Sequence, residues 1–247
     1  MPVQETGHAK NVANFEDLIS FCVGYGASYN PSKDSIKLPA LNTLHAIAKT
    51  KLAEVNAAQT PWANAVAARE ILFKPLSKLV TRVINALDAS EVPKQVVDNA
   101  KTLARKIQGK RATPKNTPPP ADPAVPDEES AKNISASQMG FDNRIDNLDK
   151  LIQLLSAQTG YAPNETELTT TALTTILTNM KAANTAVINA YTPLSNTRIE
   201  RNNILYQAET GLVDIAAGVK KYVKSVFGAT NPQYKQISGL KFINLQN

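Results

Sequence analysis

The chain has 247 residues, of which 43% are hydrophobic, and it carries 27 Lys and Arg against 21 Asp and Glu. A chain of this length buries roughly 70–75% of its unfolded surface, so it can hold a core without disulfides or a metal. The single cysteine, Cys22, excludes an internal disulfide, and two widely separated histidines, His8 and His45, exclude the usual zinc site. No segment reaches the roughly 18 apolar residues of a membrane span, and the N-terminus lacks the pattern of a signal peptide. We therefore expect a cytoplasmic protein without a cofactor or a metal.

The first part of the chain predicts two helices. Apolar residues recur at the steps of one helix face at Phe15, Leu18, Ile19 and Cys22. A longer stripe follows at Leu41, His45, Ala48, Leu52, Val55 and Gln59. We expect this second helix to begin near Pro39. We expect it to end at Thr60, because Thr caps helices well and Pro61 suits the first turn of the next one.

Two further helices are predicted before the chain changes character. The stripe of the third helix is Trp62, Val66, Arg69, Phe73, Leu76, Val80, Val83 and Leu87. Pro75 lies inside it and should kink or break it, because proline removes a backbone hydrogen bond. The fourth stripe is Val96, Val97, Ala100, Leu103 and Ile107.

A connector rich in proline follows, with the sequence GKRATPKNTPPPADPAVPDEESAKNIS from Gly109 to Ser135. Proline fixes φ and cannot donate a backbone hydrogen bond, so this stretch can be neither a helix interior nor a central strand. We interpret residues 110–135 as an acidic linker.

The second half predicts the same order of elements. A short stripe holds Leu148, Leu151, Ile152 and Leu155, and a longer one runs over Leu173, Leu177, Met180, Asn184, Val187 and Tyr191. Asn164 and Glu167 have the spacing of a capping box at the start of the long helix. We expect that helix to end at Thr192, with a new one beginning at Pro193 and continuing from Leu194 to Val226. A short segment, NPQYKQISGLKF, takes the place of the fourth helix.

The two halves keep a fixed interval, which we call the repeat interval. Thr60-Pro61 recurs as Thr192-Pro193, and the spacing from Pro61 to Pro193 defines this interval. The pairs Pro31 and Pro163 and Arg69 and Arg201 keep the same spacing. The sequence therefore predicts an all-α protein built as a tandem repeat. Each copy is a bundle of three or four antiparallel helices, in residues 1–109 and 136–247, and the Pro-rich linker joins them.

Two stretches of the second half carry a resemblance to a known group. AVINAYTPLSNTRIERNNILY (residues 186–206) and VKKYVKSVFGATNPQYKQISGLKF (residues 219–242) resemble helical tandem-repeat proteins of Bacteroidetes-like bacteria. The resemblance implies a repeated helical fold and assigns no activity and no site residue.

The sequence offers little catalytic chemistry. It has no phosphate-binding loop, because its glycines are scattered and CVGYGASY lacks the residues of such a loop. His45 lies on a packing stripe, where a histidine is more often a core residue than a general base. Cys22 also lies on an apolar stripe, without the cationic neighbours that make a thiol reactive. We therefore predict that the protein is not an enzyme.

Basic residues gather at the end of the first half. They are Lys94, Lys101, Arg105, Lys106, Lys110, Arg111 and Lys115. Such a face can follow the phosphates of a nucleic acid, with binding that weakens steeply as salt rises. Alternatively it is a solvated helix end, where Lys and Arg favour the helix dipole.

Arg69 and Arg201 lie on stripes that are otherwise apolar. An Arg that faces a bundle interior needs a partner, because removing its charge from water costs several kcal/mol. Asp17 and Asp149 share the repeat interval on the first helix of each copy. We predict structural ion pairs Arg69–Asp17 and Arg201–Asp149; alternatively, each Arg reaches solvent from the edge of its stripe.

Together these features predict a non-enzymatic structural or protein-interaction protein, which presents two related helical surfaces to a protein partner or to further copies of itself. The alternative is a nucleic-acid-binding protein that uses residues 94–115. No membrane association is expected.

Overall fold

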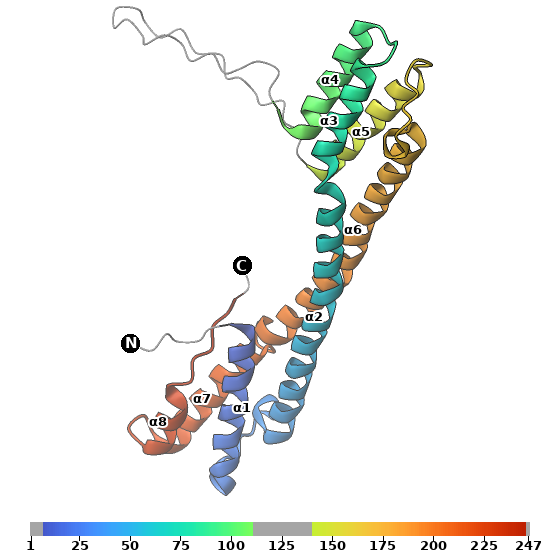
Figure 1. The fold of residues 1–247 in the computed structure, drawn as a ribbon. Helices are drawn as coiled ribbons and strands as arrows, with labels where there is room; N and C mark the ends of the chain where they lie inside the picture. Colours follow the sequence, from blue (N-terminus) through green and yellow to red (C-terminus); the bar gives the residue numbers. More distant parts are fainter. Residues whose placement is uncertain (1–6, 111–139, 246–247) are drawn as a thin grey trace, which may run out of the picture. The chain divides into compact units, whose positions relative to one another are not determined.

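The structure is a computed structural model that describes residues 7–110 and 140–245 (Figure 1). Every regular element in those two ranges is a helix, and neither range contains a strand. The all-α prediction is therefore confirmed. The predicted linker, residues 110–135, lies outside the described residues except for Lys110.

Each half of the chain provides four α-helices and at least one short 3₁₀ turn. The first half contains α1 (His8–Gly24), η1 (Gly26–Ser28), η2 (Asp34–Ile36), α2 (Leu38–Phe73), α3 (Leu76–Asp88) and α4 (Lys94–Gln108). The second half contains α5 (Phe141–Ser156), η3 (Thr166–Leu168), α6 (Thr170–Tyr206), α7 (Leu212–Phe227) and α8 (Pro232–Ser238).

Several helix ends lie where the sequence predicts them. Helix α2 begins one residue before Pro39, and the break between α2 and α3 falls at Lys74 and Pro75. Gly109 ends α4 in the left-handed conformation, at φ 67°, which glycine adopts without the strain of a Cβ. Proline and glycine decide these boundaries through local backbone chemistry alone.

The predicted ends at Thr60 and Thr192 are wrong. Pro61 lies inside the 36 residues of α2, and Pro193 lies inside the 37 residues of α6. Each proline deprives the carbonyl four residues earlier of its helical partner. Both prolines are exposed to solvent, and so are Ala57 and Asn189, which carry those carbonyls. Water can therefore satisfy the freed groups, and the helices continue.

The second half breaks its long helix later than the sequence predicts. Residues 207–211 separate α6 from α7, although the predicted stripe runs on from Leu194 to Val226. A Cβ on Gly211 would lie 2.6 Å from the backbone nitrogen of Gln207, so this turn requires glycine. The predicted capping box at Asn164 is also absent. The hydroxyl of Thr169 instead accepts a hydrogen bond from the N–H of Ala172, in the first turn of α6.

The described chain forms two compact units, and they do not follow the predicted division into residues 1–109 and 136–247. Among the described residues, one unit joins residues 7–63 with residues 189–245, and we call it unit 1. The other joins residues 64–110 with residues 140–188 and is called unit 2. The boundaries fall inside α2 and α6, close to Pro61 and Pro193, so each long helix contributes residues to both units.

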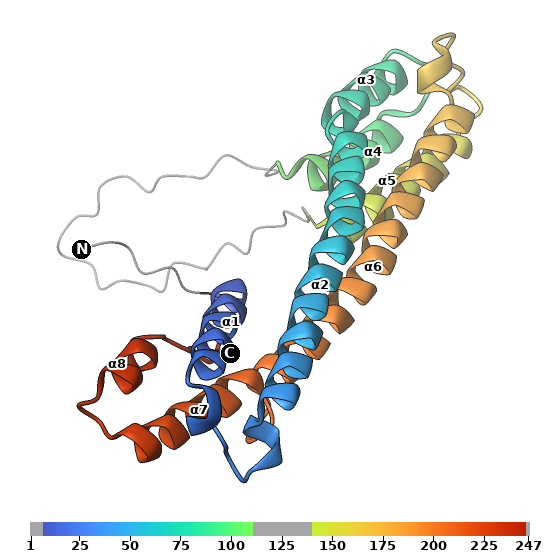
Figure 2. The same ribbon diagram turned by 90° about the horizontal axis from the view of Figure 1, so that it is seen from below.

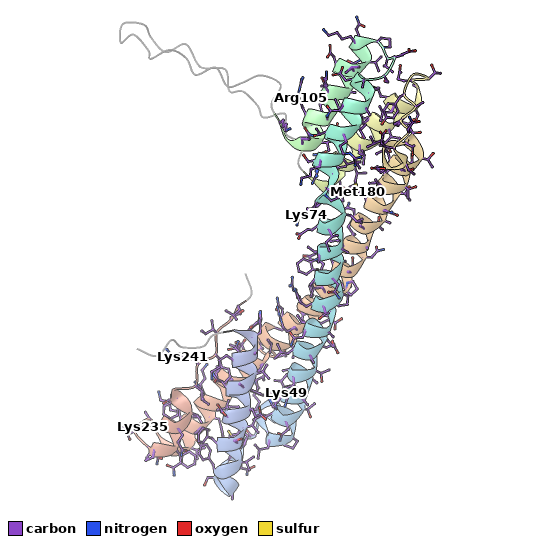
Figure 3. The ribbon with its side chains drawn as sticks, in the orientation of Figure 1. Lys49, Lys74, Arg105, Met180, Lys235 and Lys241 are labelled. Atoms are coloured by element: carbon purple, nitrogen blue, oxygen red, sulfur yellow. The ribbon has the colours of Figure 1, made fainter. Side chains whose placement is uncertain are left out.

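Each unit has a hydrophobic core drawn from both halves of the chain. In unit 1, α1 packs against α7 and α8, and Phe15 of α1 meets Phe242 edge to face at 6.5 Å (Figures 1 and 2). In unit 2, α4 packs against α5, and Phe73 of α2 meets Phe141 at 4.9 Å. Met180 of α6 is buried in the same core (Figure 3). The last helices of each half therefore complete a core begun by the first helix of the other half.

Contacts in the two units recur at the repeat interval. In unit 1 the hydroxyl of Tyr29 donates to the carbonyl oxygen of Ile36 at 2.6 Å. In unit 2 the hydroxyl of Tyr161 donates to the carbonyl oxygen of Leu168 at 2.8 Å. The two tyrosines are separated by the repeat interval, and so are the two acceptors and the turns η2 and η3. Below, positions separated by this interval are called equivalent.

The continuity of α2 can be tested by replacing its proline. Inside a helix, proline is about 3 kcal/mol less favourable than alanine, so Pro61→Ala should raise the free energy of unfolding by up to about 3 kcal/mol. Pro232→Ala is the matched control, because Pro232 occupies the first turn of α8, where proline costs nothing. Urea unfolding measures both. If Pro61→Ala, like the control, does not raise the free energy of unfolding, α2 ends at Thr60.

Candidate functional site

Arg69 does not pair with Asp17. Its guanidinium lies over the ring of Phe141, 3.8 Å from the centroid, and donates to Asn184 at 2.9 Å. Asn184 in turn donates to Asp142 at 2.6 Å. Stacking on an aromatic ring and one hydrogen bond to an amide oxygen stabilise the positive charge. The planar guanidinium of arginine suits both contacts.

Arg201 does not pair with Asp149 either. It donates two hydrogen bonds to the side chain of Asn202, at 2.8 and 3.1 Å. It also lies close enough to His8 to help lower the pKa of that imidazole, although burial of the ring is the larger cause. The nearby Nδ1 of His8 is 2.6 Å from the hydroxyl of Tyr206.

The predicted ion pairs do not form because the Arg and the Asp of each predicted pair lie in different units. Arg69 and Asp149 lie in unit 2, whereas Arg201 and Asp17 lie in unit 1. Asp149 pairs with Lys181 at 2.7 Å, and this bond holds the pKa of its carboxyl below the usual range. Asp17 is exposed on α1. The prediction assumed that each half folds by itself.

The predicted basic face on α4 is interrupted by acidic residues. Lys101 pairs with Asp88 at 3.0 Å, and Asp98 shares the face of Lys94 and Arg105. Arg105 and Lys106 occupy the last turn, where positive charge favours the helix dipole. Lys110 is exposed, and Arg111 and Lys115 lie outside the described residues. Within residues 94–110, α4 therefore offers no continuous row of free cations to a polyanion.

The two residues considered as catalytic groups are enclosed in unit 1. Cys22 is fully buried, and burial raises the pKa of its thiol to about 11, which keeps it protonated at neutral pH. Nε2 of His45 lies 3.7 Å from a carboxylate oxygen of Glu16, too far for a hydrogen bond. In residues 7–110 and 140–245, no three His, Cys, Asp or Glu side chains gather as a metal site would need. No helix in those ranges is long and apolar enough to cross a bilayer.

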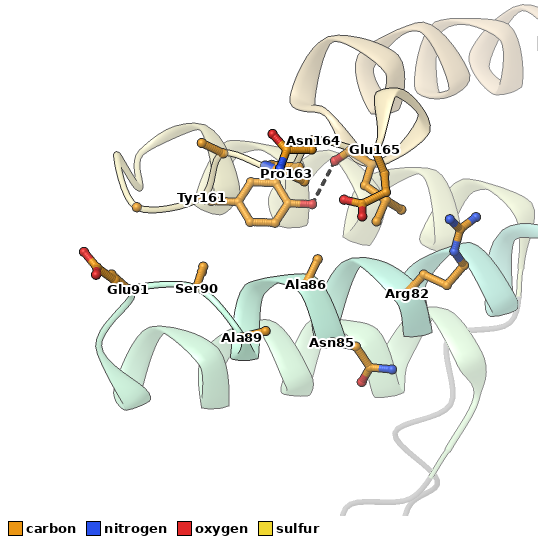
Figure 4. A pocket seen from close by; sticks show the side chains of 13 residues that line it. Arg82, Asn85, Ala86, Ala89, Ser90, Glu91, Tyr161, Pro163, Asn164 and Glu165 are labelled. Carbon is orange, nitrogen blue, oxygen red and sulfur yellow. Dashed lines mark hydrogen bonds between the residues drawn. The ribbon is translucent and has the colours of Figure 1, made fainter.

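Unit 2 contains a groove, which we call the Tyr161 groove (Figure 4). It has a volume of about 730 Å³. One wall is the segment from Gly160 to Leu168, between α5 and α6. The other wall is the end of α3 and the turn after it, with Arg82, Asn85, Ala86, Ala89, Ser90 and Glu91.

A close backbone approach closes one end of the Tyr161 groove. A Cβ on Gly160 would lie 2.6 Å from the carbonyl oxygen of Glu91, a distance that real Cβ atoms do not adopt. Only glycine lets the two walls meet here. Further along, Arg82 pairs with Glu167 across the walls at 2.7 Å. The two walls therefore approach each other at Gly160 and are bridged by the Arg82–Glu167 pair.

The equivalent place in unit 1 is filled by the protein itself. Tyr222 lies inside α7, and its ring meets the ring of Tyr29 edge to face at 5.4 Å. Counted from the first residues of the two helices, Leu76 of α3 and Leu212 of α7, Tyr222 matches Ala86, which lines the Tyr161 groove. The hydroxyl of Tyr222 accepts a hydrogen bond from the backbone N–H of Asn30 at 3.1 Å. Where unit 1 has a tyrosine side chain, unit 2 has an alanine and open space.

The polar groups of the Tyr161 groove suit binding better than reaction. Burial raises the pKa of Tyr161 to about 12, and its hydroxyl is already bonded to Leu168. The bond to Arg82 lowers the pKa of Glu167, so this carboxyl stays ionised and engaged. Asn85, Ser90 and Asn164 add neutral hydrogen-bonding groups. The walls can hold a ligand, but none of these groups is prepared for proton transfer near neutral pH.

None of the residues that line the groove was predicted as a site. Part of the signal was present in the sequence, because Tyr29 and Tyr161 match across the repeat interval. Reading it required knowing that the segments around Tyr29 and Tyr222 lie in one unit. A chain with two consecutive bundles would instead place Tyr29 beside Ser90.

The role of Arg69 can be tested against the predicted ion pair. Arg69→Met removes the stacked charge and leaves the amide of Asn184 without its donor, so the free energy of unfolding should fall by about 1–3 kcal/mol. Asp17→Asn should change it by less than about 0.5 kcal/mol, since the side chain is exposed and unpaired with Arg69. Urea unfolding measures both variants. Equal losses in the free energy of unfolding would indicate that Arg69 and Asp17 do form a pair.

Comparisons of the chain with protein-family models, curated proteins and solved structures find no match. The resemblance to helical tandem-repeat proteins therefore stays a prediction from the sequence. The geometry of the two units is the remaining basis for a function.

Proposed function

We propose that the protein is a non-enzymatic interaction protein, which binds a segment of a partner protein in the Tyr161 groove. One observation carries this proposal. The groove is open at a position where the equivalent site in unit 1 is filled by the chain's own Tyr222. A preformed hollow of about 730 Å³ falls in the usual size range of ligand sites.

The proposal includes an origin by duplication. We take the chain to be a tandem repeat of helical segments joined by the Pro-rich linker, with a cytoplasmic location. The repeat interval in the sequence and the matching bonds of Tyr29 and Tyr161 support the repeat. Two related surfaces then arise from one ancestral surface, and unit 1 carries Tyr222 where unit 2 carries the small side chain of Ala86.

A binding role fits the state of the groove's polar groups. Arg82 is neutralised by Glu167, and the hydroxyl of Tyr161 is engaged with a backbone oxygen. Such groups shape and orient a ligand without changing its covalent structure. Small residues on the α3 side, Ala86 and Ala89, leave room for side chains that a partner would insert.

Selection from a library of displayed peptides tests the proposal. Peptides that bind the wild-type protein through the groove should lose binding to Ser90→Tyr, which places a large side chain in the groove. Asn99→Tyr is the matched control, because Asn99 is exposed on α4 and does not line the groove. Its binding should equal that of wild type.

The readout is the dissociation constant of each selected peptide for the three proteins. A loss of at least about tenfold with Ser90→Tyr alone supports the proposed function, since filling a pocket removes the buried contacts that dominate binding. A library that yields no binder, or binders that do not distinguish Ser90→Tyr from wild type, would show that the groove is not the site.

A further inference from the structure

We infer that the Tyr161 groove recognises a tyrosine side chain of the partner segment. The inference rests on the proposed function and names the chemistry of what the groove binds. Its basis is that unit 1 already shows a tyrosine bound by the equivalent wall.

Unit 1 gives the binding geometry in full. The ring of Tyr222 stands at 85° to the ring of Tyr29, an edge-to-face arrangement that aromatic pairs prefer. Its hydroxyl accepts a hydrogen bond from the N–H of Asn30. One aromatic face and one backbone donor therefore recognise the phenol.

Unit 2 keeps both recognition groups. Tyr161 is held by the carbonyl of Leu168 as Tyr29 is held by that of Ile36, so the two rings are anchored in the same way. Ala162 is equivalent to Asn30 and is exposed. Among the described residues its backbone N–H has no hydrogen-bond partner. The aromatic wall and the donor are present, and only the phenol is missing.

The space and the charges select the class of ligand. Ala86, Ala89 and Ser90 line the α3 side, so their small side chains leave the room that Tyr222 occupies in unit 1. The groove has the size of a pocket for a drug-sized molecule, so it can hold the residues beside the tyrosine as well.

The rim disfavours an anion. Glu91 and Glu165 lie at the groove, and the one arginine there, Arg82, is already paired with Glu167. A phosphorylated tyrosine would bring about two negative charges next to these carboxylates without a free cation to meet them. The neutral phenol is the form that the groove fits.

Binding of N-acetyl-tyrosinamide to the intact protein tests the inference. Chemical shifts of the backbone amides, followed by NMR, should move at Ala162 and Ser90 with a dissociation constant of about 1 mM, as expected for so small a ligand. N-acetyl-phenylalaninamide should bind about fivefold more weakly, because it lacks the hydroxyl that accepts from Ala162. N-acetyl-phosphotyrosinamide should bind more weakly than both.

Three variants make the test specific. Ser90→Tyr should abolish the shifts. Ala162→Pro removes the N–H donor from an exposed position, so the preference for tyrosinamide over phenylalaninamide should disappear. Tyr222→Ser should open a second site in unit 1, seen as new shifts at Asn30 and a doubled stoichiometry. Amide signals from the core of the substituted unit report whether each variant is folded, and Ala162→Pro keeps the inference testable if Tyr222→Ser unfolds unit 1.

The outcomes separate this inference from the proposed function. If tyrosinamide does not bind, or binds without shifting Ala162, or binds Ser90→Tyr as well as wild type, the inference is wrong. It is also wrong if phenylalaninamide or phosphotyrosinamide binds as tightly as tyrosinamide. Selected peptides that need an open groove but contain no tyrosine would leave the proposed function intact and overturn the inference. If the selected peptides contain a tyrosine, and changing it to phenylalanine abolishes binding, both the inference and the proposed function are supported.

Discussion

The continuity of α2 and α6 through Pro61 and Pro193 is the constraint on which the other features depend. If the chain turned at either proline, each half would fold back on its own first helix. Because the helices continue, the helices that follow them pack in the other unit, and both cores contain residues from both halves. The helices tolerate their prolines since the freed carbonyls of Ala57 and Asn189 lie in exposed stretches where water replaces the lost bonds. A modest local cost thus fixes which segments of the chain meet.

The exchange of helices also determines what lies opposite each repeated position. Equivalent positions occur in different units, so Tyr29 faces Tyr222 while Tyr161 lines a groove together with Ala86 and Ser90. One unit therefore displays a filled version of the site and the other an open version. A single chain provides both the proposed binding surface and an internal example of the proposed ligand. The two walls of the open version approach each other at Gly160 and are bridged by the Arg82–Glu167 pair.

Much of the secondary structure could be predicted from local sequence patterns, but which helices pack together could not. Helical stripes, Pro75 and Gly109 predicted elements and ends because their causes lie within a few residues. Thr60-Pro61 was misread because the same dipeptide suits both a helix start and an exposed helix interior. The uninterrupted stripe on either side, with no residues left for the loop of a helical hairpin, was the better guide. The pairs Arg69–Asp17 and Arg201–Asp149 failed with that reading, and the groove could not be located before the units were known.

The central claim is that each unit is built from both halves of the chain. Nuclear Overhauser effects between aromatic side chains in the intact protein test it most directly. The account predicts effects between the rings of Tyr29 and Tyr222, and between those of Phe73 and Phe141, which lie 5.4 and 4.9 Å apart between ring centroids. Effects from Tyr29 to Ala86 and Ser90, with none to Tyr222, would contradict it, because they would show each half folding on itself.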